Sequence, residues 1–438
     1  MVATVLLPVG LTAQTVAPLM EGYCWTQLAP YNDQCPYVGN TRCATGCVAT
    51  AMAQILHYHH RAEGRGEVNY MVKATGQQLT MQFEGETYNL DALSPDGRLS
   101  ADKGELARFN YHVGASVCMQ WGPEESSSYG YAVPAGLWHF GYANEAIYLS
   151  RSWFGDDEWN GILRNELNHA RPVLYTADNG SSSHAFILDG TDGKGRYHVI
   201  WGWGTDTDGW YALDNLEPAG HKAFSINQGA VINIAPHIDR EKDGVTCYNA
   251  LQATRLGLPS GLPDTTMTTG DKMTFTASYI FNFNQLRGRG GKFGILIEDS
   301  EGNLIRRLSP SRSYGFYTHL SQSDYYGLYA YNAWTQHPDY TLRVPFEVTP
   351  DMPDGTYRIS LYFTPDYDPT QYSPVRCKKP KPYWVEVHVR DAQLGIGTVT
   401  AGDGKEGEVI CDLLGRPVDG NNVTPGIYIQ GKKKIWIR

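Results

Sequence analysis

The sequence predicts an α+β fold, in which a domain that mixes helices and strands is followed by all-β units of the sandwich type. Its 438 residues are too many for one ordinary hydrophobic core, which favours two or three domains. Hydrophobic residues make up 42% and charged residues 19%, which is typical of a packed globular protein rather than a disordered one. The 47 Gly and 29 Tyr residues, together with few long helical patterns, favour strands and turns.

The N-terminal residues 1–14 carry an apolar run that is followed by Leu-Thr-Ala-Gln. This pattern is typical of the end of a signal peptide, and we expect cleavage near Ala13 or Gln14. A basic start is missing, so the expected signal peptide is a truncated one. The alternative interpretation is a terminal strand that stays on the protein.

Residues 15–238 are expected to form the mixed domain. The segment 46–60 has apolar side chains at helical spacing (Val48, Met52 and Ile55) and closes in histidines, so it predicts one buried helix. Strand-like runs follow at 171–176, 185–189, 197–203, 209–213 and 230–234.

Residues 239–392 have the texture of an immunoglobulin-like β-sandwich, because short strand patterns alternate with turn signals. The expected strands are 274–283, 292–298, 340–348, 355–363 and 383–389. Residues 393–438 are expected to form a smaller β unit after a Gly-rich linker. Its expected strands are 408–414, 426–430 and 434–438.

Composition also argues against several classes of partner. The net charge is −10 and no basic stripe occurs, so we expect no nucleic-acid partner. No apolar run approaches the length of a membrane span. The eight cysteines form neither CxxC nor a zinc spacing, and we expect no metal and no other cofactor. Cys35 and Cys43 enclose a short loop. The sequence is compatible with a disulfide between them and also with two free thiols.

Cys47 is the candidate nucleophile. A thiol attacks only when it is ionised, and the N-terminus of a helix or a nearby imidazolium favours the thiolate. Cys47 opens the predicted helix, and Gly46 before it would let a substrate carbonyl approach the backbone. The alternative is a buried structural cysteine.

Two further residues fit the same chemistry. His184 follows a polar serine run and precedes an apolar strand, which would display an imidazole at the edge of the second lobe as the general base. Gln27 lies upstream of Cys47, and its amide could join the Cys47 N–H in an oxyanion hole. Trp201 and Trp203 are candidates to shield the imidazole from water. The alternative is that they are core aromatic residues at the end of a strand. Asp206 and Asp208 are more typical of a turn than of a calcium site.

Several ordered motifs together resemble the streptopain family of cysteine peptidases. They are the Trp-x-Gln-x-x-Pro-Tyr-Asn stretch (25–32), GCVATAMAQILHYH (46–59), SSHAFILDG (182–190), YHVIWGWG (197–204), DGWYALDNLEP (208–218) and AFSINQGAVINIAP (223–236). The resemblance covers about residues 15–238. It implies a papain-like fold and endopeptidase activity, with Cys47 as nucleophile, His184 as base and Gln27 in the oxyanion hole.

The chain departs from this family pattern at Ile200 and Thr205, where Asn and Gly are usual. An amide at position 200 would orient the imidazole as the third member of a triad does. Either a backbone carbonyl and the Trp rings hold His184 instead, or turnover is reduced. The family is also usually made as a zymogen, and only a short stretch precedes Trp25, so latency would arise elsewhere or from a segment outside this sequence.

The C-terminal segments DLLGR (412–416), PGIYI (425–429) and GKKKIWIR (431–438) resemble the sorting domains of the type IX secretion system of Bacteroidota. This resemblance implies that the type IX machinery is a partner and that the protein is secreted or held at the cell surface. The alternative is one more small β domain.

Three functions therefore compete. The first is a secreted cysteine endopeptidase that acts on protein or peptide substrates and has a small proteinaceous inhibitor as a candidate partner. The second is a catalytically weak or inactive surface binding protein, which Ile200 motivates. The third is an amidase or transferase, because the same Cys–His–Gln chemistry serves those reactions.

Overall fold

The computed structural model describes residues 14–142, 145–238, 242–245, 248–257, 266–282, 290–308, 314–315, 341–365, 370–379, 381–390, 396–398, 410–411, 418, 425–430 and 433–437. The expected signal-peptide run and most of the Gly-rich linker lie outside these residues. None of the helices in the described ranges is long and apolar enough to cross a membrane.

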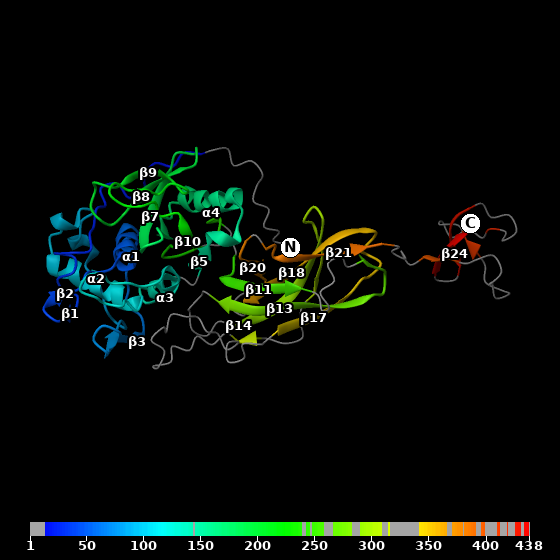
Figure 1. Cartoon of the computed structure of the whole chain (residues 1–438), viewed down its shortest axis with the longest axis horizontal. Helices are drawn as coiled ribbons and strands as arrows, with labels where there is room; N and C mark the ends of the chain where they lie inside the picture. Colours follow the sequence, from blue (N-terminus) through cyan, green and yellow to red (C-terminus); the bar gives the residue numbers. More distant parts are fainter. Residues whose placement is uncertain are drawn as a thin grey trace.

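The N-terminal part combines a helical lobe with a sheet lobe (Figure 1). Its main helices are α1 (Cys47–Tyr58), α2 (Lys103–Ser116), α3 (Val133–Trp138) and α4 (Asp156–Asn168). Its central sheet has the order β5-β10-β6-β7-β8-β9 with antiparallel neighbours throughout. These strands are β5 (Ile147–Ser150), β6 (Val173–Asp178), β7 (Ser183–Thr191), β8 (Arg196–Ile200), β9 (Gly209–Ala212) and β10 (Ile226–Ile232). Two hairpins, β1–β2 (Tyr37–Val38, Thr41–Arg42) and β3–β4 (Glu67–Val72, Gln77–Gln82), flank the helical lobe.

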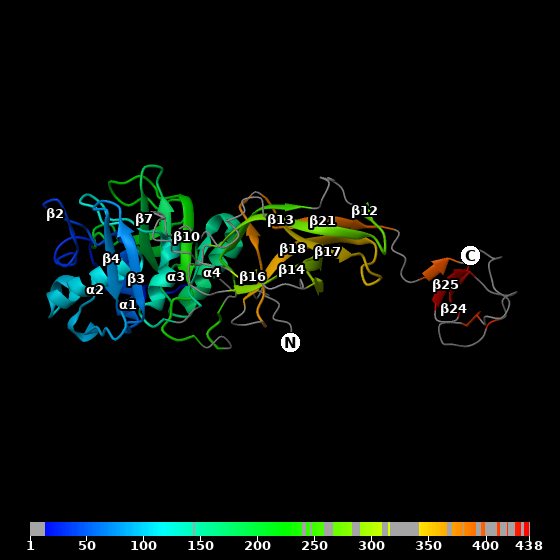
Figure 2. The same cartoon turned by 90° about the horizontal axis from the view of Figure 1, so that it is seen from below.

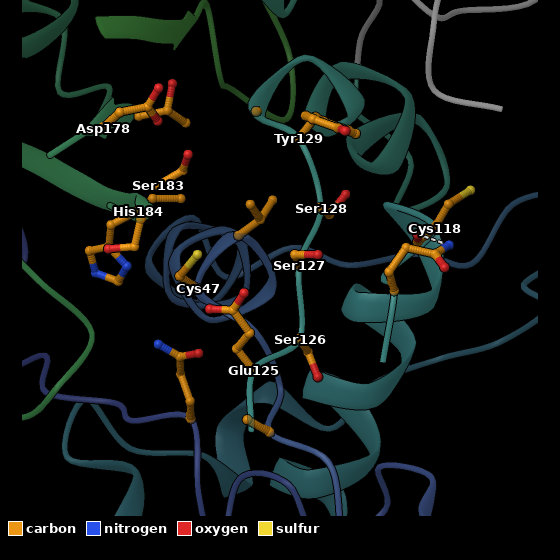
Figure 3. A pocket seen from close by; sticks show the side chains of 18 of the residues that line it. Cys47, Cys118, Glu125, Ser126, Ser127, Ser128, Tyr129, Asp178, Ser183 and His184 are labelled. Carbon is orange, nitrogen blue, oxygen red and sulfur yellow. Dashed lines mark hydrogen bonds between the residues drawn. The ribbon is translucent and has the colours of Figure 1, made fainter. Parts of the chain in front are cut away.

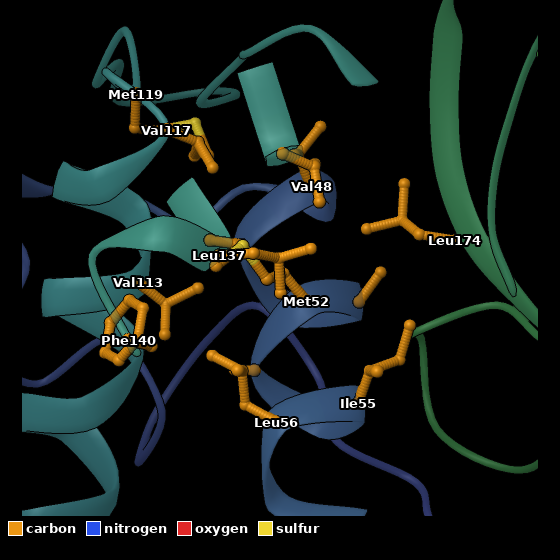
Figure 4. Packing of buried hydrophobic residues seen from close by; sticks show 14 of the residues in the cluster. Val48, Met52, Ile55, Leu56, Val113, Val117, Met119, Leu137, Phe140 and Leu174 are labelled. Atoms are coloured by element: carbon orange, nitrogen blue, oxygen red, sulfur yellow. The ribbon is translucent and has the colours of Figure 1, made fainter. Parts of the chain in front are cut away.

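The central sheet is buried on both faces because its strands alternate two sets of apolar side chains. On β7, Ile187 joins the core around α1, whereas Phe186 and Leu188 join the core that includes Trp159 and Ile162 of α4. Figure 4 shows α1 lying between the other helices of its lobe and the sheet. The sheet therefore separates two hydrophobic cores. The two lobes meet where this sheet borders the helical lobe.

Helix α1 is buried almost all round, as expected of a helix that is apolar on every face. It begins directly after Gly46, which has a φ of 87° and provides no side-chain cap. A Cβ on Gly46 would lie 2.6 Å from the Met119 sulfur and 2.9 Å from the Ser126 carbonyl oxygen. The space beside Gly46 is therefore filled by the 119–126 loop, and is not open to a substrate carbonyl as the sequence had suggested.

The following strands form two sheets around a separate core. The first sheet has the order β17-β13-β11-β20, and the second β12-β21-β18-β14-β15, with β16 beside β14 and β19 beside β18. Their bounds are β11 (Leu251–Gly257), β12 (Thr266–Met267), β13 (Lys272–Asn282), β14 (Gly290–Asp299), β15 (Leu304–Leu308), β16 (Tyr314–Gly315), β17 (Thr341–Glu347), β18 (Gly355–Pro365), β19 (Ser373–Pro374), β20 (Arg376–Cys377) and β21 (Trp384–Val389). Phe275 of the first sheet and Ile295 of the second share one buried cluster. The expected α+β architecture with a following β-sandwich is confirmed.

A small C-terminal sheet has the order β22-β25-β24-β23, formed by Ile396–Thr398, Lys433–Ile437, Gly426–Gln430 and Ile410–Cys411. The predicted strand 408–414 is described only at β23. The predicted domain limits near residues 238 and 392 fall between sheets and stay predictions.

The β-sandwich is joined to the sheet lobe by partly buried polar contacts. Figures 1 and 2 both show the central sheet between the helical lobe and the sandwich. Arg376 on β20 makes a 2.7 Å ion pair with Glu158 on α4 and packs over the Phe154 ring. The Trp153 indole N–H donates to the Gln252 amide oxygen at 2.8 Å. Separating the two parts would break this partly buried ion pair and this hydrogen bond, so both contacts resist separation.

Sequence reasoning located the strands better than the helices. It anticipated α1 and every strand of the central sheet except β5, but not α2, α4 or the β3–β4 hairpin. Helix α2 has weak amphipathic periodicity because Asn110 and His112 occupy buried positions on it. The Asn110 amide donates to the Leu106 carbonyl, which removes the cost of burying that donor.

We predict that Gly46→Ala lowers the stability of the protein by about 3 kcal/mol, because it combines a left-handed φ with an overpacked site. Chemical denaturation followed by tryptophan fluorescence measures the change.

Gly39→Ala is the matched control, since Gly39 has a φ of 62° but nothing within 4 Å of an added Cβ. It is expected to cost about 1 kcal/mol from backbone strain alone. Equal losses for the two variants would contradict the role given to the 119–126 loop.

Candidate active site

The two lobes enclose a cleft of about 880 Å³ that contains the predicted site residues Cys47, His184, Gln27 and Trp203. Cys47 comes from the helical lobe, and His184 from the sheet lobe. Figure 3 shows the Cys47 side chain at the start of its helix and the His184 side chain at one end of its strand, and both line this cleft. Trp201 is fully buried and does not line the cleft, but lies behind the imidazole.

Cys47 is the first residue of α1 and is partly exposed. Burial raises the pKa of its thiol, whereas the backbone N–H groups of Ala185 and Val48 lower it. Those amides direct positive partial charge at the sulfur, as the free N–H groups of a helix N-terminus do. The carboxylate of Glu125 acts in the opposite direction and raises the pKa of Cys47 further.

His184 lies at the start of β7, where it pairs with Ala177 of β6. Its Nε2 lies 2.8 Å from the backbone carbonyl oxygen of Trp201. Because a carbonyl can only accept, the proton of the neutral imidazole must be on Nε2. The lone pair is therefore on Nδ1, the nitrogen that remains for a proton from the thiol.

Aromatic rings pack around this imidazole. Trp203 stacks on His184 with ring centroids 4.2 Å apart, and Phe186 stacks at 6.1 Å. His221 stacks on Trp203 at 4.4 Å, so the Trp203 indole lies in contact with two imidazoles. Burial lowers the pKa of His184 to about 4, the bond to the Trp201 carbonyl raises it, and His221 lowers it. The imidazole is thus neutral through the physiological range.

The Trp201 backbone is itself held by Asp208, whose role sequence reasoning missed. The Asp208 carboxylate accepts the Trp201 N–H at 2.8 Å, and burial raises the pKa of Asp208 to about 6. The turn expected for Asp206 and Asp208 is present, because the Asp208 N–H donates to the Thr205 carbonyl. The signal in the sequence is an acidic residue shortly after the Trp-Gly-Trp-Gly motif. The carboxylate of such a residue can accept a hydrogen bond from a backbone N–H of the motif.

Ile200 does not face the imidazole. Its side chain is buried in the α1 core, and its backbone pairs with Ile187 on β7. The bond that an amide at position 200 would make is made instead by the carbonyl of the next residue, Trp201. Of the two possibilities left open by the sequence, the geometry favours a backbone carbonyl and Trp rings as the support of His184.

Gln27 is positioned by its neighbours on both sides. The Thr45 N–H donates to the Gln27 carbonyl at 3.0 Å, which ties the Gln27 backbone to the residues just before α1. The Trp25 N–H donates to the buried Gln54 side chain of α1 at 3.1 Å. These contacts place the Gln27 side chain in the same cleft as Cys47.

The described residues contain no group of three or more His, Cys, Asp or Glu side chains that could hold a metal ion. Cys35 and Cys43 are both buried as thiols, so the disulfide considered from the sequence is not formed in this structure.

Comparison with known proteins finds a match between residues 25–211 and the model of the Peptidase C10 family. The chain is 32% identical to streptopain of Streptococcus pyogenes over 243 residues, which cover 49% of this chain and 61% of streptopain. It is 34% identical over 242 residues to the thiol protease/hemagglutinin PrtT of Porphyromonas gingivalis, covering 51% of this chain and 28% of PrtT. The chain therefore spans less than two thirds of the length of these relatives.

Among solved structures, the active wild-type interpain A cysteine protease of Prevotella intermedia is similar to this chain. The sequence identity is 31%, and the match covers 50% of this chain and 95% of that one, with a TM-score of 0.47.

We predict that Trp203→Ala raises the pKa of His184 from about 4 toward the ordinary value of 6.5. Removing the stacked indole admits water to the imidazole and so lowers the penalty on its charged form. Histidine NMR titration measures the shift.

Trp210→Ala is the control, because the Trp210 indole also contacts an imidazole, but that imidazole belongs to His198 and not to His184. A His184 pKa that is unchanged by Trp203→Ala, or that Trp210→Ala shifts equally, would contradict the assignment.

Proposed function

Because the chain belongs, through residues 25–211, to the peptidase C10 family, we propose that it is a cysteine endopeptidase that hydrolyses peptide bonds in protein or peptide substrates. Cys47 is the nucleophile and His184 is the general base. The observation that carries this proposal is the presence of both residues, from opposite lobes, in one cleft. The base presents Nδ1 because its Nε2 proton is engaged by the Trp201 carbonyl.

In the first half of the reaction, the Cys47 sulfur attacks the substrate carbonyl carbon while its proton passes to Nδ1 of His184. The negative charge that develops on the carbonyl oxygen is stabilised by N–H donors. The Cys47 backbone N–H and the Gln27 side-chain amide would supply them. The resulting imidazolium gives its proton to the leaving amine, and a thioester remains on Cys47.

In the second half, a water molecule loses a proton to His184 and attacks the thioester. The same donors stabilise the second oxyanion, and the thiolate leaves and regains its proton from the imidazolium. Throughout, the Trp201 carbonyl strengthens its bond to Nε2–H as the ring becomes positive, which lowers the cost of the imidazolium in a site that otherwise disfavours it.

The alternative of an inactive binding protein rests on Ile200, and the bond between His184 and the Trp201 carbonyl argues against it. An amidase or transferase would use the same Cys47, His184 and Gln27 constellation, and differs in what it accepts rather than in how it reacts. The cleft runs across the junction of the lobes and is lined by residues from both. An extended polypeptide suits such a cleft, which favours the endopeptidase.

We also propose that the protein acts outside the cell, as a secreted or surface-held enzyme. This rests on the signal-like N-terminal run and on the C-terminal β unit, whose Gly-x-Tyr strand β24 pairs with the basic strand β25. We propose residues 15–238 as the peptidase domain, 239–392 as the β-sandwich and 393–438 as the sorting unit read by type IX machinery. A small protein inhibitor remains a candidate partner.

We predict that Cys47→Ala abolishes casein cleavage under reducing conditions, because it removes the atom that forms the thioester. An epoxysuccinyl thiol-directed inhibitor is expected to label the unmodified protein stoichiometrically and to stop its turnover. Mass spectrometry of the labelled peptide and casein fluorescence release are the measurements.

Cys24→Ala serves as the control for loss of an unrelated thiol, since Cys24 is buried outside the cleft. Intact casein together with an unlabelled Cys47 would contradict the endopeptidase. Labelling without proteolysis would favour the amidase or transferase instead.

The pH dependence of kcat/KM should have its acidic limb near pH 4, because the pKa of His184 is lowered to about 4. The neutral imidazole is the base, so activity is present above this pKa and is lost as the pH falls through it. Steady-state rates on a peptide without ionisable side chains measure the limb. An acidic limb at the ordinary histidine value of 6.5 would contradict the buried, ring-covered base.

A further inference from the structure

One carboxylate in the cleft has no part in the mechanism above. Glu125 lines the same cleft as Cys47. Figure 3 shows its side chain directed toward the Cys47 sulfur. The charge of Glu125 acts on the Cys47 thiol, because burial raises the pKa of this thiol most and Glu125 raises it further. Such a charge opposes formation of the thiolate and would slow the reaction unless something offsets it.

The position of Glu125 is set by the loop that carries it. The Gln120 and Ser127 backbones exchange two hydrogen bonds, of 2.8 and 3.1 Å, and close the loop. The Ser126 hydroxyl accepts the Gly122 N–H at 3.2 Å within it. The loop rests on the start of α1, because the Ser126 carbonyl occupies the place where Gly46 lacks a side chain. The backbone at Glu125 is therefore held at a fixed place relative to Cys47, and its side chain is exposed.

No hydrogen bond or ion pair within the described residues satisfies this carboxylate. The Glu125 carboxylate accepts no hydrogen bond from a side chain there, unlike Asp178 across the cleft, whose carboxylate accepts the Asn227 amide at 2.8 Å. The charged residues that line the cleft are Glu124, Glu125, Asp178 and Lys73. Carboxylates thus outnumber cations, and a cleft lined by one sign of charge attracts ligands of the other.

The side of the cleft on which Glu125 lies decides which part of a bound substrate is near it. His184 must reach the leaving amine to protonate it, so the segment after the scissile bond lies on the His184 and Trp203 side. Figure 3 shows Glu125 approaching Cys47 from a different side than His184 does. We place the segment before the scissile bond on the side of Cys47 toward Glu125, so that the residue whose carbonyl is attacked has its side chain nearest to Glu125.

We propose that Glu125 is a specificity-determining residue that selects substrates with a lysine or arginine immediately before the scissile bond. This inference rests on the proposed endopeptidase function and names its substrate class. A substrate cation beside Glu125 pairs with the unpartnered carboxylate. It also offsets the charge that disfavours the thiolate, so the correct substrate improves the nucleophile that attacks it.

The test compares kcat/KM for peptides that differ only in Lys, Gln or Glu before the scissile bond. The unmodified protein is expected to prefer Lys over Gln by about fivefold, the upper end for a solvent-exposed ion pair. Glu125→Gln should abolish this preference, and Glu125→Lys should reverse it in favour of Glu. Glu21→Gln is the matched control, because it removes the same charge from an exposed residue outside the cleft.

A second readout separates this proposal from the proposed function. Binding of the same peptides to Cys47→Ala, with and without Glu125→Gln, is measured by fluorescence anisotropy and needs no turnover. Tighter binding of the Lys peptide that disappears in Glu125→Gln supports the inference even if no peptide is cleaved, in which case the endopeptidase proposal fails alone. A Lys-to-Gln ratio that Glu125→Gln leaves unchanged, in rates or in binding, overturns the inference while cleavage itself sustains the endopeptidase.

The preference should also weaken as salt is added, since an exposed pair is screened within about 10 Å at 0.1 M ionic strength. A Lys preference that is indifferent to salt would show that another contact creates it, and would overturn the role of Glu125.

Discussion

The bond between the His184 Nε2–H and the Trp201 carbonyl is the interaction on which the proposed chemistry depends. It fixes which ring nitrogen carries the proton, and thereby which one is free to act. It also supplies the partial negative charge that the imidazolium needs in a site where burial lowers the His184 pKa. A backbone carbonyl is a suitable partner because its position is set by the strand and the turn that follow, rather than by a side-chain rotamer.

The rest of the sheet lobe can be understood as support for this carbonyl. Asp208 holds the Trp201 N–H, and the β7–β8 ladder holds the strand that leads to it. The helical lobe supports the other partner, because the loop packed against Gly46 defines where α1 begins and hence where Cys47 lies. The site thus depends on two backbone features, one in each lobe, and these features position the two side chains that are proposed to react.

Much of this arrangement could be predicted from the sequence, and the failures have physical causes. That Cys47 and His184 lie in one cleft could be predicted, because ordered motifs surround both residues. The support of His184 by a backbone carbonyl was one of two possibilities that the sequence left open, because a carbonyl is common to every residue and nothing in the sequence singles out that of Trp201. Glu125 was missed for a related reason, since a lone glutamate in a polar loop looks like a solvated surface residue until the loop is placed over Cys47. Helix α2 was missed because its buried Asn110 and His112 interrupt the apolar pattern.

The central claim is that a backbone carbonyl fixes the tautomer of the catalytic base. The most direct measurement is ¹⁵N NMR of histidine-labelled protein at neutral pH, in which the two ring nitrogens of His184 have distinct shifts. The account predicts a proton on Nε2 that exchanges slowly with water, and an unprotonated Nδ1. A proton found on Nδ1, or a rapidly averaged ring with no preferred tautomer, would contradict it.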